Sequence, residues 1–285
     1  MKTRRFPVWL SLSLGIVLSL GLSGCVSSTT PGAVGVQRSQ LMLVSAGQVS
    51  QMAETAFREQ NTQAATKGTF VRSGPELDRL KRIANRLIAQ TRVYRDDTAQ
   101  WAWQVVLIDE PVINATCYPG GKITFYTGII RQLRLTDGEI AAIMGHEIAH
   151  ALREHGREKI SQSMLQQTLA GVAVAVAPDK QREVALANQA ATILVQLPYS
   201  RHMELEADKM GLELMARAGF DPREAVSMQR KLMAASQGGR TPEFLSTHPA
   251  GERRVQDLNA LLPLVIPLYE RTRQENASAS TAPRG

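Results

Sequence analysis

The chain has 285 residues, of which 44% are hydrophobic, so it is long and apolar enough to form one large domain or two small ones with a real core. This composition excludes a chain that is disordered throughout. The formal net charge of +7 comes from basic residues scattered among acidic ones, and it gives no case for nucleic acid as a partner.

Residues 1–24 are predicted to be an export signal. Three basic residues, Lys2, Arg4 and Arg5, precede an almost wholly apolar run that ends in Leu-Ser-Gly-Cys at Cys25. An uncleaved membrane anchor is the alternative, but about 17 apolar positions lie at the short limit for a membrane span. The four-residue motif resembles the bacterial lipobox, which implies cleavage before Cys25 and attachment of lipid to its thiol and its new amine. The mature chain would then carry a net charge of +4, since three positive charges leave with the signal.

The lipid on Cys25 implies attachment to a membrane. Val26 stands where an aspartate commonly marks retention at the inner membrane, so the resemblance favours the outer membrane. With Cys25 modified, Cys117 has no partner within the chain for a disulfide. We therefore expect Cys117 to be buried and inert or to pair with another molecule.

Residues 25–40, rich in Ser, Thr, Gly and Val, are expected to form a flexible tether between the membrane and a domain that spans residues 41–270. A weak amphipathic pattern predicts a helix over 41–60, and a stronger pattern follows Pro75, a residue favoured in the first turn of a helix. The run 101–108 is rich in Trp, Val, Leu and Ile and predicts a strand.

Two short extended pieces are expected over 114–126, joined around Pro-Gly-Gly at 119–121. An unpaired strand edge there, beginning at Asn114 and Ala115, would offer backbone N–H and C=O groups to an extended peptide. An ordinary hairpin is the alternative.

A helix that begins at the capping box of Thr136 and Glu139 carries an HExxH motif. Residues four apart share a helix face, so His146 and His150 can both reach one cation, and two histidines make half of a zinc site. Glu147 lies beside that face, where its carboxylate can take a proton from a zinc-bound water.

His155, nine residues after His146, is expected to face away from the site and to lie at the surface. Residues 162–197 form two apolar pieces separated by Pro178-Asp179, and the longest unbroken apolar run is too short to span a bilayer. A helical hairpin that covers the active-site side is expected, with core packing as its default role and a lid as the alternative.

The third metal ligand is expected on the helix that follows Tyr199. Glu204 and Asp208 are four apart and share a face of this helix, whereas Glu206 points the other way. We assign Glu204 as the ligand and Asp208 as the carboxylate that holds the other ring nitrogen of a ligand histidine. Solvated acidic residues on an exposed helix face are the alternative.

HExxH followed by Ser-Arg-x-x-Glu-x-Glu-Ala-Asp at 200–208 resembles the gluzincin metallopeptidases of the CAAX-prenyl-protease and HtpX class, in particular the BepA- and LoiP-like lipoprotein type of bacterial envelopes. The resemblance covers roughly residues 41–262. It implies one Zn²⁺ ion bound by His146, His150 and Glu204, with Glu147 as the catalytic base.

The same resemblance implies roles for residues outside the two helices. Asn114 and Ala115 resemble the edge strand that gluzincins pair with the substrate backbone. His248, within Thr-His-Pro, resembles a family histidine that contacts zinc in an autoinhibited state, and Arg254 resembles an arginine that helps to stabilise the oxyanion. The candidates for holding the oxyanion are Tyr199, Arg201, His248 and Arg254.

The sequence therefore predicts a mainly helical α+β domain of the zincin type with a small sheet, followed by a disordered tail over 271–285. We expect an endopeptidase, lipid-anchored at Cys25 in the outer membrane and facing the periplasm, that degrades unfolded or misassembled envelope proteins. A zinc-bearing chaperone or assembly factor for outer-membrane proteins, with latent proteolysis, is the main alternative, and a zinc hydrolase of cell-wall amides is a third. Glu147 argues against a purely structural metal site, because zinc binding alone does not need that carboxylate.

Overall fold

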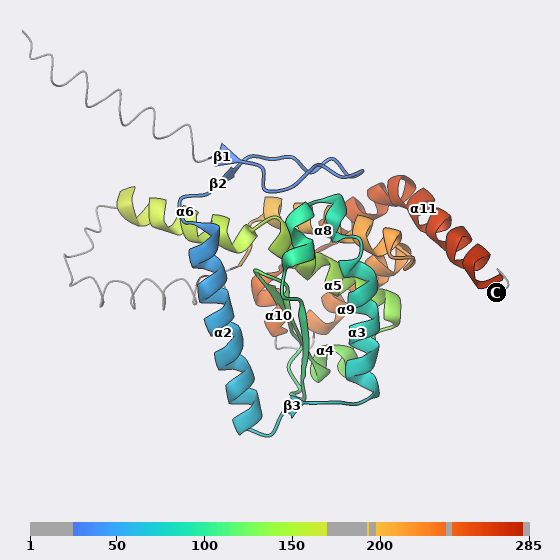
Figure 1. Cartoon of the computed structure of the whole chain (residues 1–285), viewed down its shortest axis with the longest axis horizontal. Coiled ribbons are helices and arrows are strands. Elements are labelled where there is room, and N and C mark those ends of the chain that lie inside the picture. Colours follow the sequence, from blue (N-terminus) through green and yellow to red (C-terminus); the bar gives the residue numbers. More distant parts are fainter. Residues whose placement is uncertain (1–24, 170–192, 194–197, 238–240, 282–285) are drawn as a thin grey trace, which may run out of the picture.

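The computed structural model describes residues 25–169, 193, 198–237 and 241–281 (Figure 1). This part of the chain is mainly helical with a small mixed sheet, which confirms the predicted α+β class. The helices are α2 (Ala46–Thr66), α3 (Pro75–Ile88), η2 (Thr91–Val93), η3 (Asp96–Gln100), α4 (Thr127–Gln132), α5 (Asp137–Leu152), α6 (His155–Leu169), α8 (Arg201–Arg217), α9 (Arg223–Ser236), α10 (Glu243–Thr247) and α11 (Glu252–Thr281). The strands are β1 (Cys25–Val26), β2 (Gln40–Leu41), β3 (Phe70–Val71), β4 (Gln104–Ile108), β5 (Ala115–Tyr118) and β6 (Lys122–Tyr126).

The larger sheet places β5 at its edge. The strand order is β3-β4-β6-β5, in which β4 and β6 are parallel and the two outer strands are antiparallel to their neighbours. Within the described residues β5 pairs with β6 alone, so its other side is a free edge. Helix α5 packs against β5. The edge expected at Asn114 and Ala115 therefore lies beside the HExxH helix.

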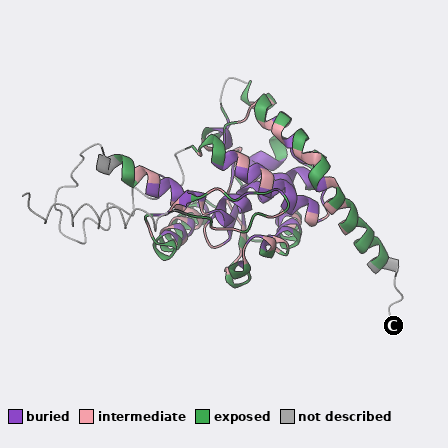
Figure 2. Ribbon diagram, turned by 90° about the horizontal axis from the view of Figure 1, so that it is seen from above, coloured by how far each residue is buried: buried purple, intermediate pink, exposed green. Residues whose placement is uncertain are grey.

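Helix α5 is central, because every residue from Gly138 to Leu152 is buried. Figure 2 shows that the buried residues gather in the middle of the molecule. Its N-terminus is capped as predicted, because Thr136 Oγ1 accepts from the Glu139 N–H and the Glu139 carboxylate accepts from the Thr136 N–H. Helix α8 approaches α5 closely where Gly145 faces Gly211. A Cβ atom on Gly211 would lie 2.7 Å from the backbone nitrogen of His146. The missing side chains thus allow the two motif-bearing helices to lie side by side.

The sheet separates the main core from a smaller one. Along β4, Leu107 belongs to the main core that surrounds α5 and α8, whereas Val106 and Ile108 belong to a second cluster with Phe57 of α2. Successive residues of a strand point to opposite faces. Helix α2 therefore covers the face of the sheet opposite to α5.

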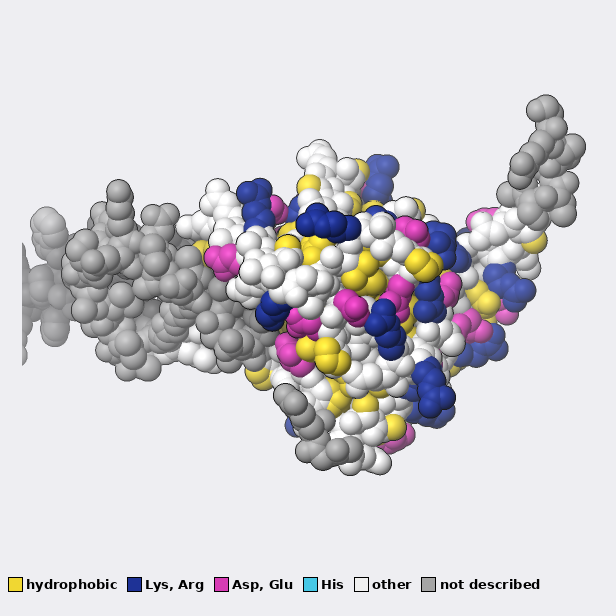
Figure 3. All heavy atoms as spheres, turned by 90° about the horizontal axis from the view of Figure 1, so that it is seen from below, with side chains coloured by type: hydrophobic (Ala, Val, Ile, Leu, Met, Phe, Trp, Pro, Cys, Tyr) yellow, Lys and Arg dark blue, Asp and Glu magenta, His cyan; other side chains and the backbone are white. Residues whose placement is uncertain are grey.

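Acidic and basic side chains lie among one another on the face of the molecule drawn in Figure 3. Many surface charges are paired, for example Arg131 with Glu76 at 2.8 Å and with Asp109 at 2.9 Å.

The segment 25–40 packs against the domain, which corrects the prediction of a flexible tether. β1 pairs with β2, and the side chains of Val34 and Val36 are buried. The backbone N–H of Val34 donates to the Glu213 carboxylate over 3.1 Å. The tether was predicted from the Ser, Thr, Gly and Val content of this segment. Composition gives no information about contacts with side chains that lie far away in the sequence.

The C-terminal end also differs from the prediction. Helix α11 continues to Thr281, through most of the stretch 271–285 for which a disordered tail was expected. Glu, Arg, Gln and Ala are good helix formers, and they extend a helix that is already nucleated.

Most of the hairpin expected over 162–197 lies outside the described residues. Its described part consists of α6 as far as Leu169 and of the buried residue Ile193. None of the described helices has an apolar stretch of the length that crosses a membrane.

Candidate metal centre

Helix α5 brings His146 and His150 together. Their ring centroids are 4.6 Å apart, and their Nε2 atoms lie 3.1 Å from each other. Both side chains are almost fully buried. The two Nε2 atoms point into one small space, as the HExxH spacing predicts.

Helix α8 adds the carboxylate of Glu204 to that space. Glu204 Oε1 lies 3.3 Å from His150 Nε2, and Glu204 Oε2 lies 3.6 Å from His146 Nε2. Glu206 turns to the opposite side of α8 and binds other partners. The close approach of the two helices at Gly145 and Gly211 makes these short distances possible.

His248, directly after α10, closes the same space from a third element. Its Nδ1 lies 2.9 Å from Glu204 Oε1 and 3.2 Å from His146 Nε2. On its other side, Nε2 lies 3.3 Å from Glu147 Oε1. The ring of Phe244 stacks on the ring of His248 with centroids 4.6 Å apart. His248 therefore stands between Glu147 and the other three side chains.

These donor atoms fit a zinc ion. One atom from each of His146, His150, Glu204 and His248 lies within 4.8 Å of the others. Imidazole nitrogens and a carboxylate oxygen are ligands that Zn²⁺ prefers, commonly four in a tetrahedral arrangement. Ring nitrogens that meet at 3.1 and 3.2 Å repel through their lone pairs unless a proton or a cation lies between them.

Glu147 lies beside this cluster and is 3% exposed. Burial raises the pKa of its carboxyl group, and the nearby histidines His248 and His146 only partly oppose this effect. The backbone N–H of Cys117 also interacts with the carboxylate. A buried carboxyl group with a raised pKa suits a residue that accepts a proton and later returns it.

The charges of Glu204 and His150 suit metal binding. Burial by itself would raise the pKa of Glu204, but the positive charges of His248 and Arg254 outweigh it and hold that pKa well below the ordinary range. Burial lowers the pKa of His150 well below its ordinary value. Glu204 is thus ionised and His150 neutral, which are the forms that bind a metal.

Asp208 and Arg254 support His146 from behind. His146 Nδ1 lies 3.0 Å from Asp208 Oδ1, and the guanidinium of Arg254 donates to both oxygens of Asp208 over 2.6 and 2.7 Å. A further nitrogen of Arg254 lies 2.7 Å from Glu204 Oε2. Arg254 therefore binds the carboxylates of Asp208 and Glu204. The resemblance implies a different role for Arg254, the stabilisation of the oxyanion.

The ring of Tyr199 stacks on His150 with centroids 3.9 Å apart. The Lys159 ammonium lies 4.0 Å from the centroid of that tyrosine ring, and burial lowers the pKa of Lys159 to about 8. No motif or spacing in the sequence connects Lys159 of α6 with the metal site, so sequence reasoning missed it. Arg201 is exposed.

The free edge of β5 lies next to these groups. Tyr126 donates its N–H to the Asn114 carbonyl, so Asn114 and Tyr126 form a hydrogen-bonded pair. Hydrogen-bonded and non-hydrogen-bonded pairs alternate along an antiparallel ladder. The backbone groups of Ala115 and Cys117 therefore point away from β6. Asn114 Oδ1 accepts from the Ala115 N–H over 2.9 Å, and its Nδ2 donates to Glu243 over 3.0 Å. Asn114 thus ties the start of the edge to α10, the helix that leads to His248.

His155 is buried rather than at the surface, which corrects the prediction from spacing. Its Nδ1 lies 2.8 Å from His150 Nδ1, and its side chain is fully enclosed. Helix α5 ends at Leu152, and Glu154 has a positive φ of 52° before α6 begins. The prediction assumed one continuous helix, and the turn at Glu154 brings His155 back to His150.

Cys117 is buried, and burial raises the pKa of its thiol well above the ordinary value. This agrees with the expectation of an inert thiol. The backbone of Cys25 lies in β1, whereas residues 1–24, the predicted export signal, lie outside the described residues.

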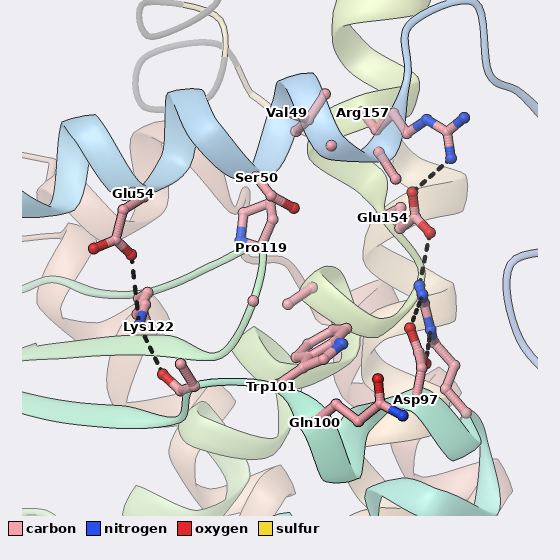
Figure 4. A pocket seen from close by; sticks show the side chains of 16 residues that line it. Val49, Ser50, Glu54, Asp97, Gln100, Trp101, Pro119, Lys122, Glu154 and Arg157 are labelled. Atoms are coloured by element: carbon pink, nitrogen blue, oxygen red, sulfur yellow. Dashed lines mark hydrogen bonds and ion pairs between the residues drawn. The ribbon is translucent and has the colours of Figure 1, made fainter.

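Two cavities border this region. One of about 580 Å³ is lined in part by Tyr199, Glu204 and Arg254, so it reaches the cluster from the side of α8 and α11. Another of about 370 Å³ is lined in part by Pro119 and Gly120, which directly follow β5 (Figure 4). The second cavity therefore continues the line of the edge strand.

The charged groups around the second cavity are paired with one another. Figure 4 shows Lys122 beside Glu54 and Glu154 beside Arg157. The nitrogen–oxygen distances of these two pairs are 3.5 and 2.8 Å, and Glu154 also pairs with Arg95 at 2.7 Å. This cavity carries no histidine in its lining. Its lining therefore differs from the metal cluster, which contains three histidines.

The sequence profile of peptidase family M48 matches residues 75–262. Mitochondrial metalloendopeptidase OMA1 of Arabidopsis thaliana is 39% identical to this chain, and the matched region covers 54% of this chain and 30% of the relative. The OMA1 of Schizosaccharomyces pombe is 33% identical, and the matched region covers 65% of this chain and 52% of the relative. The β-barrel assembly-enhancing protease of Escherichia coli is 28% identical over 56% of this chain and 35% of its own length. The chain thus spans roughly a third to a half of the length of these relatives.

The comparisons overturn the predicted location. Relatives that share the higher identities are named as mitochondrial proteins, whereas the bacterial relative is more distant. The prediction of a Gram-negative outer membrane, facing the periplasm, is therefore wrong. It rested on a four-residue motif ending at Cys25 and on the single residue Val26, and signals this short arise easily by chance.

Proposed function

The chain belongs to peptidase family M48 and is a zinc-dependent metallopeptidase, and we propose that it acts as an endopeptidase on unfolded or misassembled proteins. The observation that carries this proposal is the buried cluster of His146, His150, Glu204 and His248 with Glu147 beside it. A site built only to hold zinc would not need a carboxylate with a raised pKa at its side.

We propose that His146, His150 and Glu204 hold the zinc ion. When bound, zinc supplies Lewis-acid chemistry, because it polarises a peptide carbonyl and lowers the pKa of water. Asp208 orients His146 through its Nδ1, and Arg254 in turn holds Asp208. Such outer partners fix the direction of a ligand imidazole.

Glu147 is the proposed proton carrier. Its carboxylate takes a proton from the attacking water and gives it to the leaving amine as the peptide bond breaks. Burial, which raises the pKa of this group, brings it closer to neutral pH and so eases both transfers.

The proposed substrate-binding element is the free edge of β5. Backbone groups of Ala115 and Cys117 point away from β6. In this structure the Ala115 N–H donates to Asn114 Oδ1 and the Cys117 N–H interacts with Glu147, so an extended peptide that pairs with this edge as an added strand would replace these contacts. This recognition uses backbone groups, and a folded protein rarely exposes an extended segment. Unfolded or misassembled chains are therefore the proposed substrates.

Entry of a substrate requires a movement of His248. The side chains of His146, Glu147, Glu204 and His248 are only 3 to 4% exposed. Asn114 and Ile113 hold α10 across the start of the β5 edge, through Glu243 and through the Phe244 N–H. We propose that this structure is a closed form and that displacement of α10 with His248 opens it.

Two finer parts of the proposal concern the substrate class and the lipid on Cys25. Misassembled envelope proteins stay a proposed substrate class because the name of the Escherichia coli relative refers to β-barrel assembly. Lipid on Cys25 stays a prediction that rests on the Leu-Ser-Gly-Cys motif alone.

Glu147→Gln tests the proposed reaction. Gln keeps the size of the side chain but cannot accept a proton, so cleavage of unfolded casein should fall by about 10²–10⁴-fold. Zinc content, measured by mass spectrometry of the metal, should stay at one ion per chain. His146→Ala is the matched variant, and it should lose both cleavage and zinc.

A Glu147→Gln protein that keeps its zinc and degrades casein as fast as the wild type would show that the proposed mechanism is wrong. Mass spectrometry of the casein products would identify the cleaved bonds and confirm cleavage within the chain.

A client-binding chaperone with latent proteolysis is the second candidate, and the closed site is the observation that favours it. The two functions separate in cells that carry Glu147→Gln or His146→Ala. Proteolysis as the main function requires that both variants fail to rescue misassembled clients. Rescue by Glu147→Gln would assign the main function to client binding.

A further inference from the structure

His155 and Glu206 form a chain of contacts that ends on His150. His155 Nδ1 lies 2.8 Å from His150 Nδ1, and His155 Nε2 lies 2.9 Å from Glu206 Oε2. All three side chains are buried. The contact involves the nitrogen of His150 that faces away from the metal cluster, so it leaves Nε2 available to a metal ion.

The positions of the hydrogen atoms follow from this geometry. A neutral imidazole that binds a metal through Nε2 carries its hydrogen on Nδ1, so His150 donates to Nδ1 of His155. His155 then carries its own hydrogen on Nε2 and donates it to Glu206. The carboxylate of Glu206 can only accept, and it therefore selects the one arrangement in which both contacts are hydrogen bonds.

Glu206 is itself held by two guanidinium groups. Arg38 donates to its two oxygens over 3.0 and 3.1 Å, and Arg153 donates to it over 3.2 Å. Arg38 also forms two hydrogen bonds to Glu158, of 2.6 and 2.8 Å. Two positive and two negative side chains thus lie together, and the ionised form of Glu206 is strongly favoured.

The N-terminal segment completes this group of charges. Arg38 belongs to the segment 25–41, and Gln40 of the same segment donates to Glu158 over 2.9 Å and to the backbone carbonyl of Arg153 over 2.6 Å. Arg153 donates in turn to the carbonyl of Arg38 over 2.9 Å. The segment that composition predicts to be a tether therefore contacts the partners of Glu206 directly.

We propose that His155 and Glu206 are positioning residues for His150, and that Arg38 of the N-terminal segment holds Glu206 in place. This inference rests on the proposed zinc site. Each histidine of HExxH then has a carboxylate behind it, His146 through Asp208 directly and His150 through His155. In the second case the support extends to the N-terminal segment.

Zinc affinity of the full chain, measured by competition with a chromophoric chelator, tests this proposal. His155→Phe removes the acceptor from His150, and Glu206→Gln removes the anionic acceptor from His155. Loss of such outer partners weakens metal binding by about 10- to 100-fold, and we expect a loss of this size for both variants. Arg38→Met should cause a smaller loss in the same direction.

Glu213→Gln is the matched control. Glu213 lies two turns beyond Glu206 on α8, is fully buried, and also binds the N-terminal segment through the Val34 N–H. Its other partners are Tyr94 and Arg217, and neither is a candidate ligand. We expect this variant to lose stability while its zinc affinity stays at the wild-type value.

Cobalt substitution gives a second measurement that a purely structural role would not change. The visible spectrum of Co²⁺ reports the geometry of its ligands, so it should shift in His155→Phe and Glu206→Gln but not in Glu213→Gln. If His155→Phe does not fold, Glu206→Gln decides the role of the pair. Arg38→Met decides the role of the N-terminal segment, because Arg38 is one-third exposed and Met keeps most of its stem.

Folded His155→Phe and Glu206→Gln proteins with zinc affinities within about twofold of the wild type and an unchanged cobalt spectrum would overturn the proposal. An unchanged zinc affinity in Arg38→Met would remove the role of the N-terminal segment. Failure of the wild type to bind zinc, or of His150→Ala to lose it, would instead refute the proposed metal site.

Discussion

Glu204 and Glu206 lie on opposite sides of α8 and meet different partners. Glu204 faces His146, His150 and His248, whereas Glu206 faces His155 and two arginines. A separation of two residues on a helix turns the side chain by about 200°, so the two carboxylates cannot serve one centre. The first suits a metal ligand and the second suits a support behind the ligands.

The pKa of Glu206 leads to a prediction for stability in acid. Burial would raise this pKa, but His155 and Arg38 outweigh burial and hold it at about 2, below the ordinary value of 4.5. A pKa lowered by folding contributes stability above the unfolded value, and the contribution disappears as the pH falls from about 4.5 towards 2.

Glu206→Gln should therefore be less stable than the wild type at pH 7, and the gap should narrow below about pH 4.5. Urea unfolding of both proteins between pH 7 and pH 3 measures the free energies. A gap that stays constant over this range would contradict the assignment of the low pKa to Glu206.

At the scale of elements, α10 and the residue after it cover the centre and are the proposed control of access to it. His248 contacts both Glu204 and Glu147, and Phe244 of α10 stacks on its ring. The same short helix is bonded to Asn114 beside the β5 edge. A single movement of α10 would therefore free the base and the edge together.

His248→Ala should raise the rate of casein cleavage several-fold, because it removes the side chain that stands between Glu147 and the other cluster residues. Zinc affinity should fall, since one of four candidate ligands is lost. His202→Ala, a change at an exposed histidine of α8, is the control and should alter neither value. A loss of cleavage in zinc-saturated His248→Ala would show that His248 takes part in catalysis instead of blocking the site.

The edge strand β5 leads to a prediction about substrates. In an extended peptide paired with an edge, alternate N–H groups face the edge, while the others face away. Methylation of single backbone nitrogens around the cleaved bond should therefore lower kcat/KM at every second position. Each lost hydrogen bond is worth about 0.5–1.5 kcal/mol, which corresponds to a decrease of roughly 2- to 10-fold.

The peptide series is best assayed with zinc-saturated enzyme and with the unmethylated peptide as reference. Equal sensitivity at consecutive positions, or none, would rule out strand pairing with β5 as the mode of recognition.

At the scale of the whole molecule, the centre joins three parts that are distant in sequence. α5, α8 and the turn after α10 each contribute side chains to it, and α8 also contacts α11. Without a cation, one buried carboxylate and three imidazoles face one another at short range. Metal binding should therefore stabilise the entire domain.

Removal of zinc with a chelator should lower the melting temperature. At free zinc about 1,000-fold above Kd the bound ion adds about 4 kcal/mol, which for a domain of this size corresponds to roughly 10 °C. Scanning calorimetry before chelation, after it and after return of zinc measures the effect. His150→Ala should melt at the same temperature with and without zinc. If chelation lowers the melting temperature of His150→Ala as much as that of the wild type, the stabilising ion binds elsewhere.

The sequence by itself determined the features that depend on local geometry. The spacing of His146 and His150, the capping box at Thr136 and the position of Glu204 relative to Asp208 all follow from the period of an α-helix. The strand pattern after Asn114 likewise predicted an extended piece, and the α+β class followed from these elements. The structure agrees on these points because each concerns residues within one or two helical turns, or within one strand.

Only the tertiary structure decided which distant residues meet. His155 reaches His150 because one left-handed residue, Glu154, ends the helical period that the prediction extended. Arg38 contacts Glu206 from a segment that is 168 residues away in the sequence, and Arg254 contacts Asp208 from α11. Such contacts depend on chain reversals and on the packing of helices at glycines, and neither leaves a periodic pattern in the sequence. The motifs therefore predicted the candidate ligands and the carboxylate behind His146, whereas the contacts behind His150 could not be predicted from them.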